Sequence, residues 1–380
     1  MQENRILTQK YKIAIVSQAS GGIYTHVKNI ISHLNKDKFD LEMIVPEGNL
    51  VELAKEYNIK FQICKMKRNV SPFSDINAIV HLIQIFKKGQ FDIIHLHSGK
   101  AGLLGRLAQL FHQNSKLVFT PNAFSYLSCT NLFTRWLFLM IEKSLRLLTD
   151  LLIVVSHSEK KRALDEVGYD INKVSQVNNS IEANFQLLNC EAKNDPFEVI
   201  MIARPSFQKN CIMFLRVAQK IITLRKQTKF LLVNAGNYSP QTDLIRYLIK
   251  QMGLLNNVKI VDWSDEATLN YYIDNSKILV STSLYEGLPY SLLQAMRLKK
   301  PIVATYVDGN RDIVQDGYNG FLVDIDDDYL MATKIITLLD DLKLQCIMGE
   351  NGYNRLIEYF NSAFNVKQLE IVYEECLRKN

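Results

Sequence analysis

The sequence lacks the residue patterns on which several classes of protein depend. Its six cysteines are scattered and form no C-x-x-C pair (positions 64, 129, 190, 211, 346 and 376). This spacing predicts neither a zinc site nor a disulfide framework and favours a reducing compartment. No apolar run reaches the length of a membrane span, because Trp136–Ile141 is followed directly by Glu142 and Lys143. Met1–Lys10 is polar, so we expect no signal peptide and a cytoplasmic protein.

Several binding motifs are missing as well. No basic run with interleaved aromatic residues appears, so we expect no nucleic-acid partner. The sequence contains neither G-x-G-x-x-G after its first strand run nor a P-loop, which removes support for dinucleotide and ATP binding. Asp326–Asp328 is the densest acidic run in the second half and is typical of a helix start, not of a metal-binding loop.

Positive charge is concentrated in the first half of the chain. The 380 residues carry a net charge of +6. Residues 1–190 hold 23 Lys and Arg against 16 Asp and Glu, whereas the remainder holds 22 against 23. A basic first half suits an anionic partner, such as a membrane surface or a pyrophosphate-linked lipid. A solvated face without any partner explains the same charge equally well.

Strand-like runs alternate with helical patterns along the whole chain, which is typical of parallel sheets wrapped by helices. A polar stretch at 189–196 predicts a linker between an N-terminal domain, 1–188, and a C-terminal domain, 197–360, with a last helix in 361–380. Two doubly wound domains would hold a ligand in the cleft between them. Strands are expected at 12–17, 40–45, 61–65, 91–96, 115–120, 151–156, 174–178, 197–203, 229–235, 257–261, 278–282, 301–304 and 320–323.

The most informative segment is Ser283–Met296, with the sequence SLYEGLPYSLLQAM. A strand run ends just before it, and Gly-Leu-Pro leads into a helix. Glu286 would therefore lie at the carboxyl end of a strand, beside the backbone N–H groups of Tyr290 and Ser291 at a helix start. Such a start binds phosphate, and a neighbouring carboxylate can hold sugar hydroxyls. The segment predicts a nucleotide-sugar site; its simpler alternative is a strand, a turn and a helix with an exposed Glu.

In each half of the chain, the loop after the first strand carries a further candidate site. Gly21 and Gly22 form a turn in which a backbone can approach a phosphate closely. Arg204 and Lys209, in ARPSFQKN, could neutralise a departing diphosphate, because placed cations act where charge develops. On their own, glycine pairs are more often structural and loose cations are more often solvated.

Together these motifs resemble those of retaining glycosyltransferases of family 4. Ser283–Met296 is similar to the E-x7-E region, with Gln294 at the second Glu. SGGIYTH resembles the G-G-x-x-x-H loop, and ARPSFQKN the G-R-x-x-x-x-K loop with Ala203 for Gly. Asn122, in TPNA, stands where the family commonly has His near the reaction centre. Asn can hydrogen-bond there but cannot carry a proton.

Two segments, 68–75 and DIIHLHSGKAG at 92–102, resemble a narrower branch of the family. Members of this branch add sugars to lipid-linked precursors of surface polysaccharides. We expect His95 and His97 to point to opposite faces of their strand, one of them packed in the core. The resemblance then assigns contact with the acceptor or donor phosphate to four residues: His26, His97, Ser98 and Lys100.

The resemblance implies a GT-B fold, with two Rossmann-like domains facing across a cleft and the last helix crossing back onto the first. It implies that Glu286 positions the sugar hydroxyls and that Trp263 lies at the nucleobase, which the family holds largely through backbone groups. Gln294 would bind the ribose. The diphosphate would be held by Arg204, Lys209 and the amides of Tyr290 and Ser291. No metal or other cofactor is expected, since cations and helix dipoles can replace the ion.

The resulting expectation is transfer of a hexose or N-acetylhexosamine from a nucleoside diphosphate sugar, with UDP favoured, to a glycan hydroxyl with retention. The acceptor is expected to be polyprenyl-diphosphate-linked, and the enzyme to be peripheral on the inner face of an anionic membrane. Two alternatives stay open: a nucleotide-sugar epimerase and a non-catalytic relative. The helix at 133–148 also leaves two interpretations, contact with a bilayer or burial against a sheet.

Overall fold

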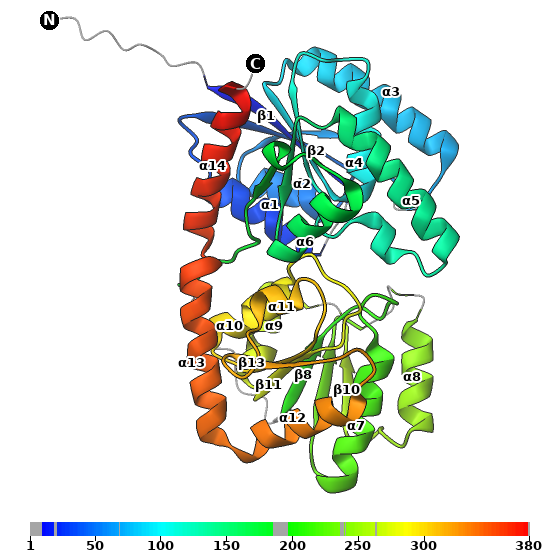
Figure 1. Cartoon of the computed structure of the whole chain (residues 1–380), viewed down its shortest axis with the longest axis vertical. Helices are drawn as coiled ribbons and strands as arrows, with labels where there is room; N and C mark the ends of the chain where they lie inside the picture. The colour runs from blue at the N-terminus through cyan, green and yellow to red at the C-terminus, as the bar shows by residue number, and fades with distance from the viewer. Residues whose placement is uncertain are drawn as a thin grey trace, which may run out of the picture. The chain divides into compact units, whose positions relative to one another are not determined.

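The computed structural model describes residues 10–18, 21–67, 69–184, 197–235, 239, 241–262 and 264–378. The chain divides into two compact units (Figure 1). Unit 1 consists of Met1–Asn179 with Ser362–Asn380, and unit 2 consists of Ser180–Asn361. The expected linker at 189–196 lies outside the described residues.

Unit 1 is built on a seven-stranded parallel sheet in the order β3-β2-β1-β4-β5-β6-β7. The central strand β4 is buried along its whole length, as strands with helices on both faces are. The strands are β1 Tyr11–Ser17, β2 Phe39–Val45, β3 Lys60–Ile63, β4 Ile93–His97, β5 Lys116–Thr120, β6 Leu151–Val154 and β7 Val174–Gln176.

Helices cover both faces of the unit 1 sheet. Apolar residues of α1, α2 and α14 pack on one face, and those of α3, α4 and α5 pack on the other. Their bounds are α1 Gly22–His33, α2 Asn49–Glu56, α3 Pro72–Gly89, α4 Ser98–Gln109, α5 Leu132–Leu145, α6 His157–Arg162 and α14 Ser362–Arg378. Short turns of 3-10 or π geometry lie at Ser125–Ser128, Arg146–Leu148, Ala163–Val167 and Ile171–Lys173.

The last helix, α14, belongs to unit 1 although it follows unit 2 in sequence. Its Tyr373 is fully buried in the core shared with α1. At the surface Lys38 pairs with Glu374 at 2.7 Å, and Asn365 Nδ2 donates to the Asn178 carbonyl at 3.1 Å. The end of the chain therefore completes the core of its first sheet.

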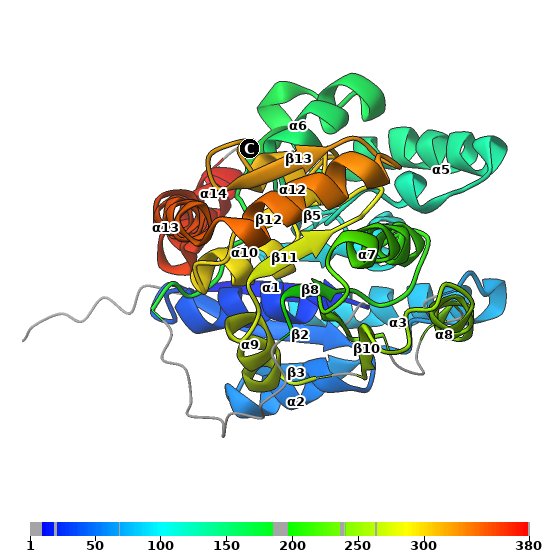
Figure 2. The ribbon, with the colours of Figure 1, turned by 90° about the horizontal axis from the view of Figure 1, so that it is seen from below.

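Unit 2 contains a six-stranded parallel sheet in the order β10-β9-β8-β11-β12-β13, the order of a dinucleotide-binding fold. Apolar residues of α7, α8 and α12 form its main core with the strands, and Figure 2 shows α7 and α12 running alongside the sheet. The strands are β8 Val199–Ile202, β9 Phe230–Val233, β10 Val258–Val261, β11 Ile278–Ser281, β12 Ile302–Thr305 and β13 Gly320–Val323. The helices are α7 Cys211–Leu224, α8 Thr242–Gln251, α9 Glu266–Asp274, α10 Tyr290–Arg297, α11 Asn310–Ile313, α12 Asp328–Asp340 and α13 Leu342–Tyr359.

The predicted class, two doubly wound parallel-sheet domains, is confirmed by both sheets. Every expected strand run overlaps an observed strand. The reason is physical: strands buried on both faces need continuous apolar runs, and such runs bounded by turn residues are readable without tertiary information.

A buried ion pair joins α4 to α5 within unit 1. Arg106 of α4 contacts Glu142 of α5 through two hydrogen bonds, at 2.6 and 2.9 Å. Its Nε donates to the Gly102 carbonyl at 2.8 Å, and the guanidinium lies 4.1 Å from the centre of the Phe119 ring. With Arg106 only 1% exposed, this pair fixes which side of α5 faces the sheet.

Replacing Glu142 by Ala is expected to destabilise unit 1 by about 3 kcal/mol or more, because the Arg106 charge would stay buried without its partner. The measurement is urea unfolding followed by circular dichroism. Asp165→Ala removes one side of the exposed Lys161–Asp165 pair and serves as the control, with a change within about 0.5 kcal/mol. Equal losses in the two variants would contradict the expectation.

Candidate active site

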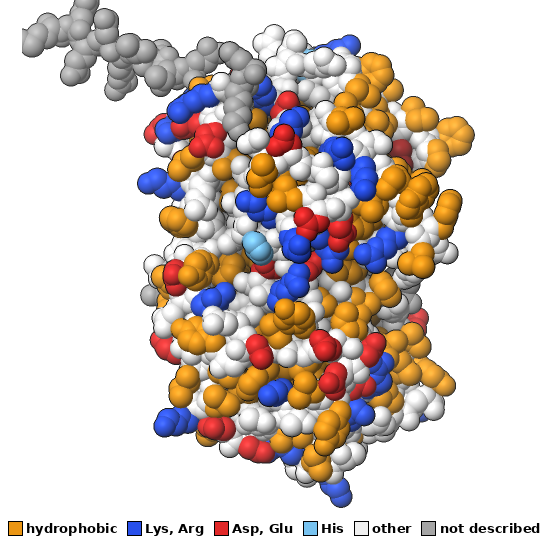
Figure 3. Space-filling model, viewed as in Figure 1, with side chains coloured by type: hydrophobic (Ala, Val, Ile, Leu, Met, Phe, Trp, Pro, Cys, Tyr) orange, Lys and Arg blue, Asp and Glu red, His pale blue; other side chains and the backbone are white. Residues whose placement is uncertain are grey.

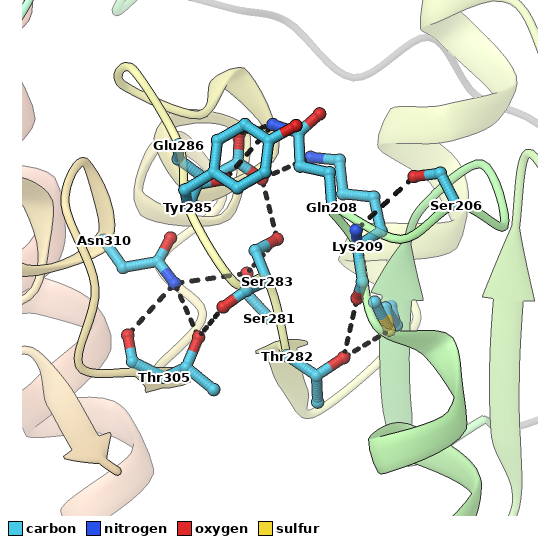
Figure 4. A network of polar contacts seen from close by, with 11 residues as sticks. Ser206, Gln208, Lys209, Ser281, Thr282, Ser283, Tyr285, Glu286, Thr305 and Asn310 are labelled. Carbon is cyan, nitrogen blue, oxygen red and sulfur yellow. Dashed lines mark hydrogen bonds and ion pairs between the residues drawn. The ribbon is translucent and has the colours of Figure 1, made fainter. Parts of the chain in front are cut away.

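Unit 2 gathers polar side chains at the carboxyl edge of its sheet (Figure 4). Lys209 lies in the loop between β8 and α7, and Glu286 lies in the loop between β11 and α10. Asn310 begins α11 after β12. Because β8, β11 and β12 are neighbours in a parallel sheet, loops distant in sequence converge at one edge.

The Glu286 carboxylate is the centre of this cluster. Its Oε1 accepts hydrogen bonds from Lys209 Nζ at 2.6 Å and from Ser283 Oγ at 2.7 Å. Its Oε2 accepts one from Gln208 Nε2 at 3.1 Å. A carboxylate has about four acceptor positions, so Glu286 can accept a further hydrogen bond from a ligand hydroxyl. The predicted pair, Glu286 and Lys209, is thus brought into direct contact.

Two hydrogen bonds to backbone carbonyls join these two loops. Thr282 Oγ1 lies at 3.0 Å from the Lys209 carbonyl oxygen, to which it donates, and the Leu284 amide donates to the Gln208 carbonyl at 2.8 Å. The position of Lys209 therefore depends on the backbone of its neighbour loop as well as on its own charge. Gln208 and Ser283 are not singled out by the sequence analysis, although each lies within a quoted motif.

Gly309 allows the loop after β12 to lie against the Glu286 loop. Its φ is 76°, and a Cβ at this position would come within 2.7 Å of Glu286 Cβ and 2.9 Å of the Gly287 oxygen. A larger residue would therefore push the catalytic candidate out of place. The next residue, Asn310, is fully buried. Sequence reasoning misses both residues, and the available signal was the Asp-Gly pair soon after a strand run.

The start of α10 follows Glu286 by four residues. Pro289 is the N-cap and no side chain caps the helix, and the first amides of a helix have no carbonyl partner within it. Tyr290 and Ser291 form this first turn, as the motif predicts. Gln294 lies one turn further along and is buried.

Two further candidates for the donor site are Arg204 and Trp263. Arg204 is exposed at the carboxyl end of β8, in the same loop as Lys209. Trp263 lies outside the described residues. Its neighbour Ser264 is buried, and the Ser264 amide donates to Asn234 Oδ1 at 3.1 Å. The roles of Arg204 and Trp263 in binding stay predictions.

Unit 1 gathers a second polar group at the carboxyl edge of its own sheet. Ser17 ends β1 and His97 ends β4, and the two are paired in register. Asn122 follows β5, whose last residue pairs with His97. Among the described residues, Ser17 Oγ, both ring nitrogens of His97, Ser98 Oγ and Asn122 Nδ2 are buried and have no hydrogen-bond partner. Such atoms are costly to bury, which makes this edge a candidate for binding a polar ligand.

The expectation that His95 and His97 point to opposite faces is wrong. Their ring centres lie 3.9 Å apart. Side chains alternate along a strand with a period of two, so residues two apart share a face. The expectation of one core histidine is confirmed, since His95 Nδ1 lies 2.6 Å from Tyr373 Oη and Nε2 lies 2.8 Å from Thr120 Oγ1.

Burial keeps the three histidines of this edge neutral. It lowers the pKa of His26 to about 4, against a smaller opposing effect of the hydrogen bond with Asn179. Burial, followed by the neighbouring His95 and His26, holds the pKa of His97 well below its usual range. Burial does the same to the pKa of His95. His97 therefore offers one N–H donor and one acceptor, not a charge.

Lys100 is placed differently from the other three acceptor-side candidates. Its ammonium pairs with Asp75 at 2.6 Å and both side chains are largely buried. The pair joins two segments that the sequence analysis quotes separately, 68–75 and 92–102. Lys100 fixes the start of α3 against the start of α4, and its contact with an acceptor stays a prediction.

The turn after β5 holds Asn122 in an unusual backbone conformation. Asn122 and Ala123 have φ values of 52° and 77°. Asn adopts this left-handed region more readily than most residues, and strained turns of this kind occur at binding sites. The Ala123 amide donates to Glu159 Oε1 at 2.7 Å, which anchors the turn. Gly21, with φ 75°, immediately precedes α1 and so stands at its N-terminus, as expected.

Two family models match the chain. Glycosyltransferase Family 4 matches residues 20–185, and Glycosyl transferases group 1 matches residues 189–355. Together they cover most of the sequence in the order of the two predicted domains. The chain is a glycosyltransferase, whose first part belongs to Glycosyltransferase Family 4 and whose second part belongs to Glycosyl transferases group 1.

This glycosyltransferase is 25% identical over 359 residues to UDP-Gal:alpha-D-GlcNAc-diphosphoundecaprenol alpha-1,3-galactosyltransferase of Escherichia coli, covering 90% of each chain. It is 24% identical to the capsular polysaccharide biosynthesis glycosyltransferase CapM of Staphylococcus aureus, covering 92% of this chain and 93% of CapM. The structure matches that of Anabaena Alr3699/HepE in complex with UDP-glucose with a TM-score of 0.78 and 17% identity, over 96% and 99% of the two chains. The predicted GT-B fold is confirmed.

The buried neutral histidines predict that this glycosyltransferase loses stability in acid. Between about pH 4 and 6.5 the unfolded chain binds more protons than the folded one, so the free energy of unfolding falls as the pH decreases. Each histidine contributes up to about 1.4 kcal/mol per pH unit. Urea unfolding across this range measures the slope. His26→Gln should reduce it, whereas His81→Gln, at an exposed position of α3, should not; an unchanged slope in His26→Gln would refute the assignment.

Proposed function

We propose that this glycosyltransferase moves a hexose or N-acetylhexosamine from a UDP-sugar to a hydroxyl of a polyprenyl-diphosphate-linked glycan, with retention at the anomeric carbon. The observation that carries the proposal is the ion pair between Lys209 and Glu286, the latter four residues before the start of α10. The UDP-Gal donor and the diphosphoundecaprenol-linked acceptor in the E. coli relative's name support the choice of substrates.

Donor binding is assigned to unit 2. Lys209 has three N–H donors, so it can bind Glu286 and a phosphate oxygen at the same time. Arg204 and the amides of Tyr290 and Ser291 would complete the diphosphate site, where a helix start favours negative charge. Glu286, held by its three donors, would accept hydrogen bonds from sugar hydroxyls, and Gln294 would bind the ribose through its amide.

The reaction follows from these positions without an enzymic nucleophile. The acceptor oxygen attacks the anomeric carbon from the face that the diphosphate leaves, and the bond between that carbon and the phosphate oxygen breaks. The departing diphosphate takes the proton of the acceptor hydroxyl, so charge and atoms balance. Lys209 and Arg204 stabilise the negative charge as it develops on the leaving oxygen.

Acceptor binding and sugar positioning are assigned to unit 1. The buried unpartnered Nδ2 of Asn122 can donate to a hydroxyl, and His97 can donate and accept in its neutral form. Ser98, His26 and the Gly21–Gly22 turn would line the same site. Lys100 acts on it through Asp75, by holding the start of α4 that carries Ser98.

We propose further that the enzyme works without a metal ion or other cofactor and on the inner face of the membrane. In the described part of the chain, no helix combines the length and the apolarity needed to cross a bilayer. A chelator tests metal independence, and the enzyme should keep its full activity in its presence.

The function is tested by nucleotide release from a panel of UDP- and GDP-sugars, with and without a crude lipid extract. Release from one donor should rise with lipid and fall by about 10²-fold or more in Glu286→Gln, since its hydroxyl-binding charge is lost. Glu350→Gln, in the exposed Lys299–Glu350 pair, is the matched control and should keep full activity.

The same assay separates the alternatives. Conversion of a donor without acceptor and without nucleotide release would indicate an epimerase. Binding of a donor without any turnover would indicate a non-catalytic relative and would direct attention to Asn122 and Gln294. Anomeric analysis of the product by NMR tests retention, and an inverted product would overturn the mechanism.

A further inference from the structure

The outward side of α5 carries a row of exposed apolar residues. Its members lie at successive positions of one helix face and are between 37% and 82% exposed; they are Leu132, Phe133, Trp136, Leu137 and Ile141. Phe133 and Trp136 stack with ring centres 6.1 Å apart. Figure 3 shows hydrophobic side chains gathered over the region of α3 and α5. We call these five residues the α5 apolar face.

Rotation of α5 cannot bury this face, because the inner side of the helix is already committed. Phe138 and Leu139 pack against the core of the sheet. Glu142 is held by Arg106 through the buried ion pair. The alternative that the helix uses its apolar residues only for burial against the sheet therefore fails: α5 has two apolar sides, and one of them faces outward.

The start of α3 also carries exposed apolar residues. Val70, Phe73 and Ile76 are each more than half exposed. A helix that follows a parallel strand begins near the carboxyl end of that strand, so α3 and α5 both begin at the carboxyl edge of the unit 1 sheet. This is the edge that presents the unpartnered atoms of His97 and Asn122.

Exposed cations lie beside both helix starts, and the acidic residue in the first turn of α3, Asp75, is paired with Lys100. Lys65 and Lys67 are exposed just before α3, and Arg135 is exposed within the first turns of α5. From residue 93 to residue 141 the sequence contains no Asp or Glu. An apolar helix face with aromatic residues and flanking cations matches the boundary between the acyl chains and the headgroups of anionic lipids.

We propose that the α5 apolar face and the start of α3 dock on the surface of an anionic lipid bilayer. Trp136 and Phe133 enter the interface between headgroups and acyl chains, and Lys65, Lys67 and Arg135 contact lipid phosphates. The carboxyl edge of the unit 1 sheet then lies at headgroup depth, where the diphosphate of a membrane-embedded acceptor lies. Only this last statement rests on the proposed function.

Flotation with vesicles tests the surface without donor or acceptor. The full chain should bind vesicles of phosphatidylcholine and phosphatidylglycerol in equal amounts, bind phosphatidylcholine alone much less, and release at high salt. Phe133→Ser with Trp136→Ser should lower binding roughly tenfold, because buried apolar area and charge both contribute. Leu224→Ser with Tyr329→Ser is the matched control, since both residues are 77% exposed in unit 2, and it should bind like the wild type.

Fluorescence gives a second readout that does not depend on a disruptive variant. The chain has two tryptophans, Trp136 and Trp263, so Trp263→Phe leaves Trp136 as the only reporter. Lipids brominated on their acyl chains should quench its emission. Absence of quenching with bound vesicles would overturn the proposed surface, and so would equal flotation of the Phe133 and Trp136 double variant.

Two controls keep the proposal apart from other outcomes. The wild type should sediment as the double variant does, without self-association through the α5 apolar face. A wild-type dimer that the double variant abolishes would show that a second copy of the chain covers this face, and would overturn membrane docking. Nucleotide release with a water-soluble acceptor should be unchanged in the double variant, whose melting temperature reports folding. Loss of vesicle binding with this activity intact supports the surface, whereas inactivity of the wild type would count only against the proposed function.

Discussion

The candidate chemistry of this glycosyltransferase depends on one constraint, that neighbouring parallel strands end at the same edge of a sheet. In unit 1 the constraint places Ser17 beside His97. In unit 2 it brings the loops after β8 and β11 together, so that Lys209 meets Glu286 at 2.6 Å. Each group of side chains comes from segments far apart in sequence, and neither would form in an antiparallel arrangement of the same strands.

The two edges differ in charge: the unit 2 edge holds a charged and paired carboxylate, and the unit 1 edge holds neutral side chains. At the unit 2 edge the Glu286 carboxylate is paired and hydrogen-bonded by three donors. At the unit 1 edge the ring nitrogens of His97 and the Nδ2 of Asn122 are neutral, buried and unpartnered among the described residues, and burial keeps the pKa of His97 low. Paired charges suit a diphosphate whose negative charge grows during reaction, and neutral donors and acceptors suit sugar hydroxyls. This division supports the proposed roles of the two units.

Local pattern accounts for much of what could be predicted. Strand runs such as 278–282 were readable because they are continuously apolar up to their last residues, and the Glu286 motif was readable because its glycine and proline mark a strand, a turn and a helix. The contact of Lys100 with Asp75 could not be predicted, because nothing in segments 68–75 and 92–102 indicates that they lie side by side in the fold. Gly309 was missed for the same reason: its neighbour across space is the Glu286 loop.

By itself the sequence determined the alternation of strands and helices, the parallel class of both sheets and the identity of the polar residues at the strand ends, because these follow from local periodicity and turn chemistry. Only the tertiary structure decided which of those residues meet. It showed that His95 and His97 share a face, and it identified the side chains by which α14, expected from the resemblance to return to the first domain, enters the core of unit 1. It also showed that the buried Arg106–Glu142 pair leaves an apolar side of α5 facing outward, because contacts between distant segments depend on packing, which periodicity does not encode.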